Sequence, residues 1–253
     1  MQHYLPVAHE RGDLKQMKYA VYTGTRNLYP HMEVAVKSLL CNSDVDKVYL
    51  LAEDDKLPFK FPKEVEVLNV SDQEYFAEGT PNMTSNFSYM ALMRAALPLV
   101  FPEHDKILSL DVDTIVRRDI STLCDIPLDG FYFAACREIH RSYDDYLYCN
   151  HGVVLFNLET PRYTGKTEEV IDVLNRCRYK WVDQDVLNYL CQGRIKNLSS
   201  EYNVNDWTEK RPNAVRILHY AGIKDWFNQP AYLEYKAMPW DEVLRWRKER
   251  YGK

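Results

Sequence analysis

The sequence of 253 residues has no long uncharged hydrophobic run, no C-x-x-C pair and no excess of positive charge. A membrane-spanning helix needs about 20 apolar residues, and the N-terminal segment MQHYLPVAHERGD lacks the apolar core of a signal peptide. The six scattered cysteines argue against a thiolate zinc site. A net charge of −5 argues against a general nucleic-acid-binding surface. We therefore expect a cytoplasmic protein with reduced thiols and no nucleic-acid partner.

Short apolar runs typical of strands alternate along the chain with segments whose apolar residues have helical spacing. The composition, with 46% hydrophobic and 27% charged residues, is that of an ordinary globular protein. Short runs rich in β-formers predict strands at 18–23, 47–52, 64–70, 107–110, 130–136, 152–158, 194–198 and 215–219. Helical spacing predicts helices after the turn GTRN, at 87–97 before Pro98, from 183 to 190 and at 240–251. This order is typical of an α/β sheet of largely parallel strands with both faces covered.

The expected organisation is one domain, with a tail before it and a helix after it. We expect an N-terminal tail at 1–17, the main domain at 18–230 and a C-terminal amphipathic basic helix at 231–253. The final segment RWRKERYGK is basic in an acidic chain. Its cations either favour the negative end of a helix dipole or make a peripheral contact with an anionic membrane. The polar stretch 71–85 is a candidate for a mobile lid, or is only a linker.

The segment KILSLDVDTIV, residues 106–116, ends an apolar strand in Asp111 and Asp113. Two carboxylates this close repel each other unless a cation lies between them. One interpretation is a polar strand end that caps the next helix. A second is an aspartyl phosphatase of the haloacid dehalogenase type, in which the first carboxylate is a nucleophile. A third is a divalent metal site, for Mn²⁺ or Mg²⁺, that holds the diphosphate of a sugar nucleotide.

The rest of the chain favours the metal site. A phosphatase of that type has its nucleophile strand near the start of the catalytic domain, whereas several expected strands and helices precede this one. Near the other end, ILHYAGIKDWF brings His219 to the edge of a strand. Gly222 and Lys224 follow at once, as a loop that approaches phosphate would need. A distant histidine is a suitable further ligand for the ion.

With these residues in view, the chain resembles the family 8 retaining glycosyltransferases, the group that includes glycogenin and bacterial lipopolysaccharide galactosyl- and glucosyltransferases. The segments that carry the resemblance, in the family's order, are YAVYTGTRNLYPHMEVAVKSL, MRAALPLVFPEHDKILSLDVD, YCNHGVVLFNL, WVDQDVLNYL and LHYAGIKDW. The resemblance implies an α/β fold with a single GT-A type (Rossmann-like) domain and a mixed, mainly parallel central sheet. It also implies a metal-dependent, retaining transfer of a hexose from UDP-glucose or UDP-galactose to a hydroxyl of a carbohydrate or glycolipid acceptor.

The resemblance further implies roles for individual residues. The implied metal ligands are Asp111, Asp113 and His219, with Mn²⁺ the usual ion and Mg²⁺ the alternative. The residues implied in binding the UDP-sugar are Thr23, Thr25, Asn27, Arg94, Asp111, Val112, Asp113, Asn150, Gly152, Gly222 and Lys224. The implied catalytic residues are Asp183, which we expect to orient the sugar, and Gln184, at the place where a nucleophile would be sought. A non-catalytic sugar-nucleotide-binding protein remains the alternative function.

Two departures from the family's pattern bear on the site. His151 stands where small residues are common, and we expect it to narrow or alter the acceptor side of the pocket. Asp225 replaces the usual proline after Lys224, which predicts a less rigid loop at the diphosphate.

Overall fold

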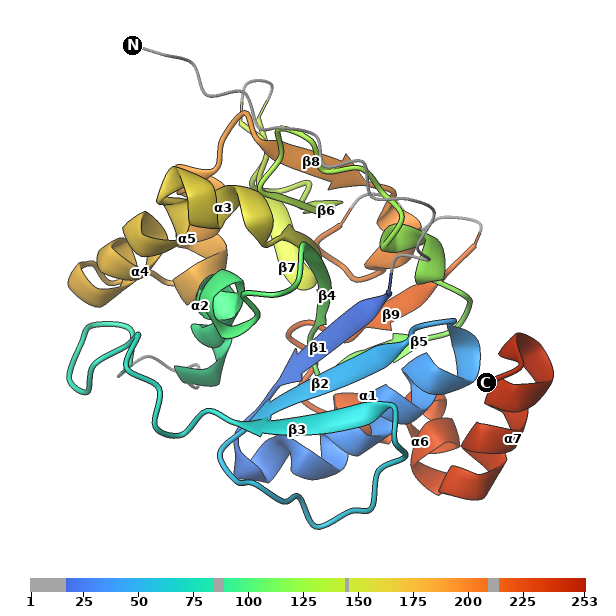
Figure 1. The fold of residues 1–253 in the computed structure, drawn as a ribbon. Helices are drawn as coiled ribbons and strands as arrows, with labels where there is room; N and C mark the ends of the chain where they lie inside the picture. Colours follow the sequence, from blue (N-terminus) through green and yellow to red (C-terminus); the bar gives the residue numbers. More distant parts are fainter. Residues whose placement is uncertain (1–16, 84–88, 144–145, 209–213) are drawn as a thin grey trace.

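The computed structural model describes residues 17–83, 89–143, 146–208 and 214–253 (Figure 1). Its centre is a seven-stranded sheet with the strand order β3-β2-β1-β4-β7-β6-β8. The strands are β1 (Tyr19–Thr23), β2 (Lys47–Ala52), β3 (Val65–Asn69), β4 (Lys106–Leu110), β6 (Phe133–Arg137), β7 (Cys149–Asn157) and β8 (Ile195–Leu198). Strands β3, β2, β1 and β4 are parallel, as are β6 and β8, whereas β7 is antiparallel to both its neighbours. The expected mixed, mainly parallel sheet is confirmed.

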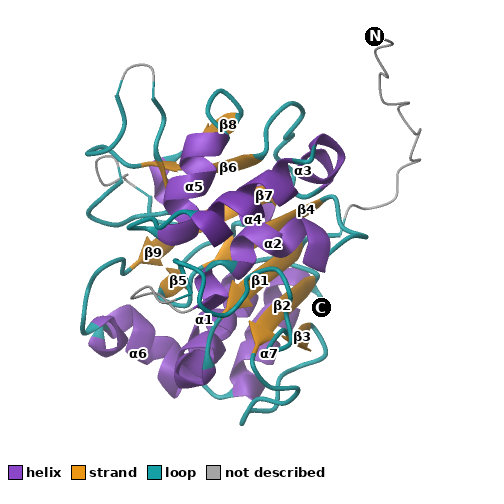
Figure 2. Ribbon diagram, turned by 90° about the vertical axis from the view of Figure 1, so that its left-hand side faces the viewer, coloured by secondary structure: helices purple, strands orange, loops and turns teal. Residues whose placement is uncertain are grey.

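Helices cover both faces of this sheet (Figures 1 and 2). One face carries α1 (Tyr29–Asn42), α6 (Pro230–Ala237) and α7 (Trp240–Tyr251), and the other carries α2 (Met93–Val100), α3 (Glu159–Thr164), α4 (Lys166–Arg176) and α5 (Val182–Leu190). Side chains alternate between the two cores along each strand. In β1, Ala20 and Tyr22 enter the first core and Val21 enters the second. The fully buried runs in the sequence arise from this two-sided burial.

The strand order predicts a ligand site at the carboxyl ends of the central strands β1 and β4. From β1 the chain proceeds outward to β2 and β3, and it then returns to the other side of β1 to form β4. Ligands of open α/β sheets bind where the strand order reverses, outside the carboxyl ends of the strands. Here those ends are Thr23 of β1 and Leu110 of β4, and Asp111 follows directly.

A separate two-stranded sheet joins segments that are far apart in the sequence. It consists of β5 (Thr114–Val116) and β9 (Ile217–His219), which pair antiparallel with Thr114 opposite His219. The backbone N–H of Tyr220 donates to the carbonyl oxygen of Asp113 at 3.0 Å. This pairing carries His219 to the aspartates.

The helix expected at 87–97 differs from the prediction at both ends. A 3-10 turn covers Tyr89–Ala91, α2 begins only at Met93, and it continues through Pro98 to Val100. Residues 87 and 88 lie outside the described residues. Pro98 is tolerated because it falls in the last turn, where one backbone hydrogen bond is lost and the turn still closes from the Phe101 N–H to the Leu97 carbonyl at 3.0 Å.

Two arginines of the C-terminal helix α7 bind backbone carbonyl groups of the protein. Arg247 is fully buried and donates to the carbonyl oxygens of Ser43 and Val45, which follow α1. Arg250 donates to the Cys41 carbonyl oxygen, also at the end of α1. These cations therefore stabilise the negative, C-terminal end of the neighbouring helix α1, and not mainly that of α7 itself. These contacts weaken the basis for the expected membrane contact.

Helices α6 and α7 also share a core with the rest of the chain. Tyr232, Tyr235 and Val243 are buried in the same hydrophobic cluster as α1. No helix in the described ranges has the length and apolar character needed to cross a bilayer. The expected tail at 1–17 lies outside the described residues, except for residue 17.

Part of the expected loop at 71–85 is firmly packed. Phe76 is buried, and Asn82, which is fully buried, donates to the carbonyl oxygens of Leu174 and Cys177 at 2.6 and 2.7 Å. Asn82 also accepts the N–H of Tyr179. Residues 84 and 85 lie outside the described residues. The packing of 71–83 against α4 favours a connecting segment over a lid.

Candidate active site

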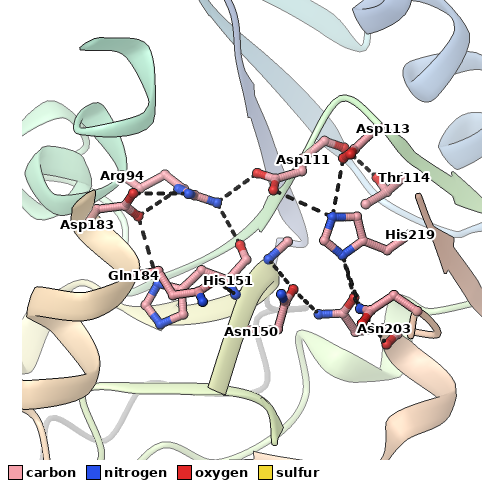
Figure 3. Close-up of polar contacts among 12 residues, drawn as sticks. Arg94, Asp111, Asp113, Thr114, Asn150, His151, Asp183, Gln184, Asn203 and His219 are labelled. Carbon is pink, nitrogen blue, oxygen red and sulfur yellow. Dashed lines mark hydrogen bonds and ion pairs between the residues drawn. The ribbon is translucent and has the colours of Figure 1, made fainter. Parts of the chain in front are cut away.

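Asp111, Asp113 and His219 form a cluster that could hold a metal ion (Figure 3). One ligand atom from each lies within 4.8 Å of the others. The His219 Nε2 is 3.3 Å from Asp113 Oδ1 and 3.8 Å from Asp111 Oδ2. Burial alone would lower the pKa of His219, but the two carboxylates outweigh burial and raise it. Two carboxylate oxygens and one imidazole nitrogen are a donor set that suits Mn²⁺.

Glycine at position 152 makes room for the histidine. A Cβ atom at Gly152 would lie 2.0 Å from Cε1 of His219, well inside contact distance. The Gly152 carbonyl accepts the N–H of Asp111 at 2.9 Å, so the same residue also fixes the first aspartate. Any larger side chain would displace the imidazole from the aspartates.

Arg94 of α2 lies between two acidic residues of the site (Figure 3). Its side chain is buried, with Nη1 2.7 Å from Asp111 Oδ1 and Nε 2.9 Å from Asp183 Oδ2. Burial would raise the pKa of the Asp183 carboxyl, but Arg94 and His151 outweigh burial and lower it. Asp111 differs, because burial and its neighbour Asp113 raise its pKa despite Arg94. Arg94 is therefore a buried residue of the site and not a solvated one on the helix surface.

The first turn of α5 presents Asp183 and Gln184. Val182, its first residue, has φ 35°, a left-handed conformation that is strained for a β-branched side chain. Such strain costs about 1–3 kcal/mol and tends to cluster at functional sites. The amide oxygen of Gln184 accepts the backbone N–H of His151 at 3.0 Å, and its NH₂ group donates to Glu138 Oε1 and Tyr148 Oη. Both residues are thus held in fixed orientations.

His151 lies on the core side of Asp183 and Gln184, and it does not line the cavity of the site. It is almost fully buried, its Nδ1 is 3.8 Å from Asp183 Oδ2, and its ring packs edge-on against Phe133. Burial lowers the pKa of His151, which favours the neutral ring. The expectation that His151 narrows the acceptor side is corrected, because its ring points into the core between β7 and α5.

A cavity of about 390 Å³ opens beside these residues, a size typical of ligand sites. The sequence-predicted residues that line it are Thr23, Arg94, Asp111, Val112, Asp113, Asn150, Gly152, Asp183, Gln184, His219 and Gly222. Thr25, Asn27 and Lys224 are described but are not part of the lining. Thr25 Oγ1 instead donates to Asn27 Oδ1 at 2.6 Å, and Lys224 is exposed on the loop after β9. The structure thus gathers most of the predicted residues, from five segments, around one cavity.

Several residues of the cavity wall were missed by the sequence analysis. They are Leu28, Met90, Ala91, Glu138, Arg141, Trp181, Val182, Trp207, Ala221 and Trp226. Asn203, which is fully buried behind His219, was missed as well. Glu138 follows directly on β6, and its place at a strand end was the one signal that could have identified it.

Comparisons with known proteins agree with this geometry. The family model described as glycosyl transferase family 8 matches residues 19–229. The chain belongs to glycosyl transferase family 8. It is similar to glycosyltransferase GlyB of Streptococcus pneumoniae, with 24% identity over 90% of this chain and 63% of the relative. It is also similar to the lipopolysaccharide 1,2-glucosyltransferase of Escherichia coli K12, with 29% identity over 51% of this chain and 46% of that protein.

The fold is that of the GT-A glycosyltransferases. The galactosyltransferase LgtC, solved in complex with donor and acceptor sugar analogs, superposes with a TM-score of 0.65 at 20% identity. That alignment covers 89% of this chain and 99% of LgtC. The chain spans less than two thirds of the length of the two curated relatives. The phosphatase interpretation of Asp111 and Asp113 receives no support from the fold or the family.

Proposed function

We propose that this glycosyltransferase moves a hexose from a UDP-sugar to an acceptor hydroxyl, with the anomeric configuration retained and with help from a divalent metal ion. The observation that carries the proposal is the Asp111, Asp113 and His219 cluster at the carboxyl edge of the sheet, facing a ligand-sized cavity. Family membership supports glycosyl transfer, and the glucosyl- and galactosyltransferase names of similar proteins support a hexose. UDP-glucose and UDP-galactose are the proposed donors.

The proposed metal ligands are Asp111, Asp113 and His219, and Mn²⁺ or Mg²⁺ is the proposed ion. The convergent donor atoms fit such an ion, since the carboxylates repel each other without one. When bound, the ion supplies positive charge that stabilises the diphosphate leaving group. Arg94 adds a fixed guanidinium next to Asp111, at the same side of the cavity. We propose that Lys224 and Gly222 close over the diphosphate from the loop after β9.

We propose that Asp183 orients the sugar and that attack occurs from the same face as departure. Gln184 is unsuited to act as a nucleophile, because an amide is weakly nucleophilic and its oxygen already accepts the His151 N–H. Arg94 contacts both carboxylate oxygens of Asp183, with Nε 2.9 Å from Oδ2 and Nη2 3.1 Å from Oδ1, so the carboxylate is held in a fixed orientation. The leaving phosphate oxygen would take the acceptor proton as the new glycosidic bond forms.

An Asp183→Asn variant tests the role of this carboxylate. We expect the turnover number to fall about 100-fold or more, because the sugar is then held less accurately, while the affinity for Mn²⁺ stays unchanged. Near-normal turnover would remove Asp183 from any essential role.

The proposed acceptor is a carbohydrate, free or lipid-linked. Trp181, Trp207 and Arg141 line the cavity, and Arg141 lies over the Trp181 ring at 4.7 Å. Aromatic faces combined with polar groups suit a sugar ring, which has an apolar face and a polar rim. A peripheral membrane contact would have to use the exposed Arg245 and Lys248 of α7. Equal liposome co-sedimentation of the wild type and an Arg245→Glu, Lys248→Glu variant would dismiss it.

A donor screen tests the proposed function. Release of UDP from several UDP-sugars is measured with and without Mn²⁺, followed by mass spectrometry of products from cell-derived acceptors. We expect metal-dependent release and retained configuration, with Asp113→Asn as the inactive control. Nucleotide binding without turnover of any donor would favour the non-catalytic alternative. Phosphate release from simple phosphomonoesters would favour a phosphatase.

A further inference from the structure

A chain of buried side-chain amides lies behind the imidazole of His219 (Figure 3). The His219 Nδ1 is 2.8 Å from Asn203 Oδ1, and Asn203 Nδ2 is 2.9 Å from Asn150 Oδ1. Asn150 Nδ2 in turn donates to Glu138 Oε1 at 2.9 Å. Asn203 is fully buried, and Asn150 and Glu138 are nearly so. Because water does not reach these groups, each must find its hydrogen-bond partner within the chain.

The direction of every hydrogen bond in this chain is fixed from its far end. The backbone N–H of Gly152, which can only donate, points to Asn150 Oδ1 at 3.0 Å. The other end of that amide donates to a carboxylate, which can only accept. Asn150 therefore presents its oxygen to Asn203, and Asn203 must present its nitrogen to Asn150. It follows that Asn203 turns its oxygen to His219.

A second anchor leads to the same orientation. Asn205 Oδ1 accepts the backbone N–H groups of Trp207 and Thr208 at 2.8 and 3.1 Å, so its NH₂ group must face the other way. That group lies 2.9 Å from Asn203 Oδ1 and 3.3 Å from His219 Nδ1. The shorter contact assigns its hydrogen bond to Asn203 Oδ1, because hydrogen bonds weaken with distance. The oxygen of Asn203 is therefore required by both of its neighbours. An unprotonated His219 Nδ1 at 2.8 Å from this oxygen would set two lone pairs against each other.

We propose that Asn203, oriented by Asn150, is a positioning residue that holds His219 in the tautomer protonated at Nδ1. The Nε2 lone pair then faces Asp111 and Asp113, where a proton would otherwise occupy the place of a metal ion. The metal-related part rests on the proposed function, whereas the tautomer itself does not. Hydrogen bonds to the second nitrogen of a metal-binding histidine fix its tautomer and ring orientation, and their loss typically weakens metal binding 10- to 100-fold.

Three variants of the full chain test this proposal. Asn203→Leu removes the side-chain hydrogen bonds to His219, Asn150 and Asn205 at nearly constant volume. Asn203→Asp keeps an acceptor for the Nδ1 proton. Asn82→Leu is the matched control, because Asn82 is equally buried and its side chain makes three hydrogen bonds to the backbone, but near α4 and away from the cavity. Circular dichroism and thermal melting show that each variant is folded. The readouts are the ¹⁵N shifts of His219, at a pH where the ring is neutral, and Mn²⁺ affinity by electron paramagnetic resonance.

Because the carboxylates raise the pKa of His219, both ring nitrogens are protonated below that pKa in the protein without metal. Above it, we expect the wild-type protein to keep the proton on Nδ1 and to lose the one on Nε2. Asn203→Leu should show the Nε2-protonated tautomer in part and should bind Mn²⁺ about 10- to 100-fold more weakly. Asn203→Asp should stay within about 10-fold of the wild type, and Asn82→Leu should match it. An Nε2-protonated ring in the wild type, or wild-type Mn²⁺ affinity in folded Asn203→Leu, would overturn the proposal.

The two readouts separate this proposal from the proposed function. A wild-type protein that shows the Nδ1-protonated tautomer but binds no Mn²⁺ supports the role of Asn203 and contradicts the metal-dependent mechanism. If Asn203→Leu does not fold, the wild-type tautomer and the Asn203→Asp affinity still decide the question.

Discussion

Replacing Arg94 with methionine removes a buried cation from between two acidic residues. The side chain keeps a similar length but loses its contacts with Asp111 and Asp183. Asp183 is fully buried, and among the described residues the side-chain partner that it would retain is His151, a histidine that burial keeps neutral. Removing one partner of a buried ion pair costs about 3–5 kcal/mol, because the other charge remains without compensation. The Asp111 contact adds less, since that side chain is 36% exposed.

The loss is measured by urea unfolding at pH 7.5, compared with the wild type and with Asp183→Asn. We expect Arg94→Met to lose about 3–5 kcal/mol of the free energy of unfolding, and Arg94→Met combined with Asp183→Asn to lose less, because no unpaired charge is then left. Arg176→Met is the control, since Arg176 forms an exposed pair with Asp172 and should cost less than about 0.5 kcal/mol.

The same loss should depend on pH with a definite sign. The pKa of Asp183 is lower in the folded state than its ordinary value of about 3.9. Its stabilising contribution is therefore complete above that value and is lost as the pH falls through the lowered pKa. The difference between wild type and Arg94→Met should shrink in acid. A loss below about 1 kcal/mol at pH 7.5, or a difference that grows in acid, would refute the reasoning.

Three further predictions follow from single contacts. Gly152→Ala should weaken Mn²⁺ binding at least about 10-fold, because the new methyl group would displace His219; unchanged binding by electron paramagnetic resonance would contradict this. Asp113→Asn should lower metal-stimulated UDP release about 100-fold or more, since one charged metal ligand is lost; activity near wild type would exclude Asp113 as a ligand. Arg247→Met should cost about 3 kcal/mol or more in urea unfolding, because two charge-assisted bonds to carbonyl groups are lost, whereas the exposed Arg245→Met should cost less than about 0.5 kcal/mol.

The sequence predicted well those features that depend on local pattern. The closing helix matches the predicted range 240–251, and the expected strands recur with ends shifted by a few residues. Asp111 and Asp113 were identifiable because paired carboxylates after an apolar strand need a cation. The pairing of β5 with β9 is a long-range contact. The sequence pattern marked His219 as a suitable distant ligand and the family resemblance implied it as one, but only the structure shows how it reaches the aspartates.

The features that were missed depend on tertiary contacts. Pro98 looked like a helix end, but its position in the last turn makes it tolerable. His151 looked like a pocket residue, but strand alternation turns it into the core. Asn203 carries no local signal, because its importance comes entirely from facing His219 and Asn150. The left-handed conformation of Val182 is equally invisible in the sequence.

The central claim is that one divalent ion is held jointly by Asp111, Asp113 and His219. Anomalous diffraction from crystals soaked in Mn²⁺ and UDP, recorded at the manganese edge, tests it most directly. We expect one strong peak within coordinating distance of both carboxylates and of His219 Nε2, with the diphosphate on its open side. A peak elsewhere, or His219 turned away with no ion between it and the carboxylates, would contradict the account.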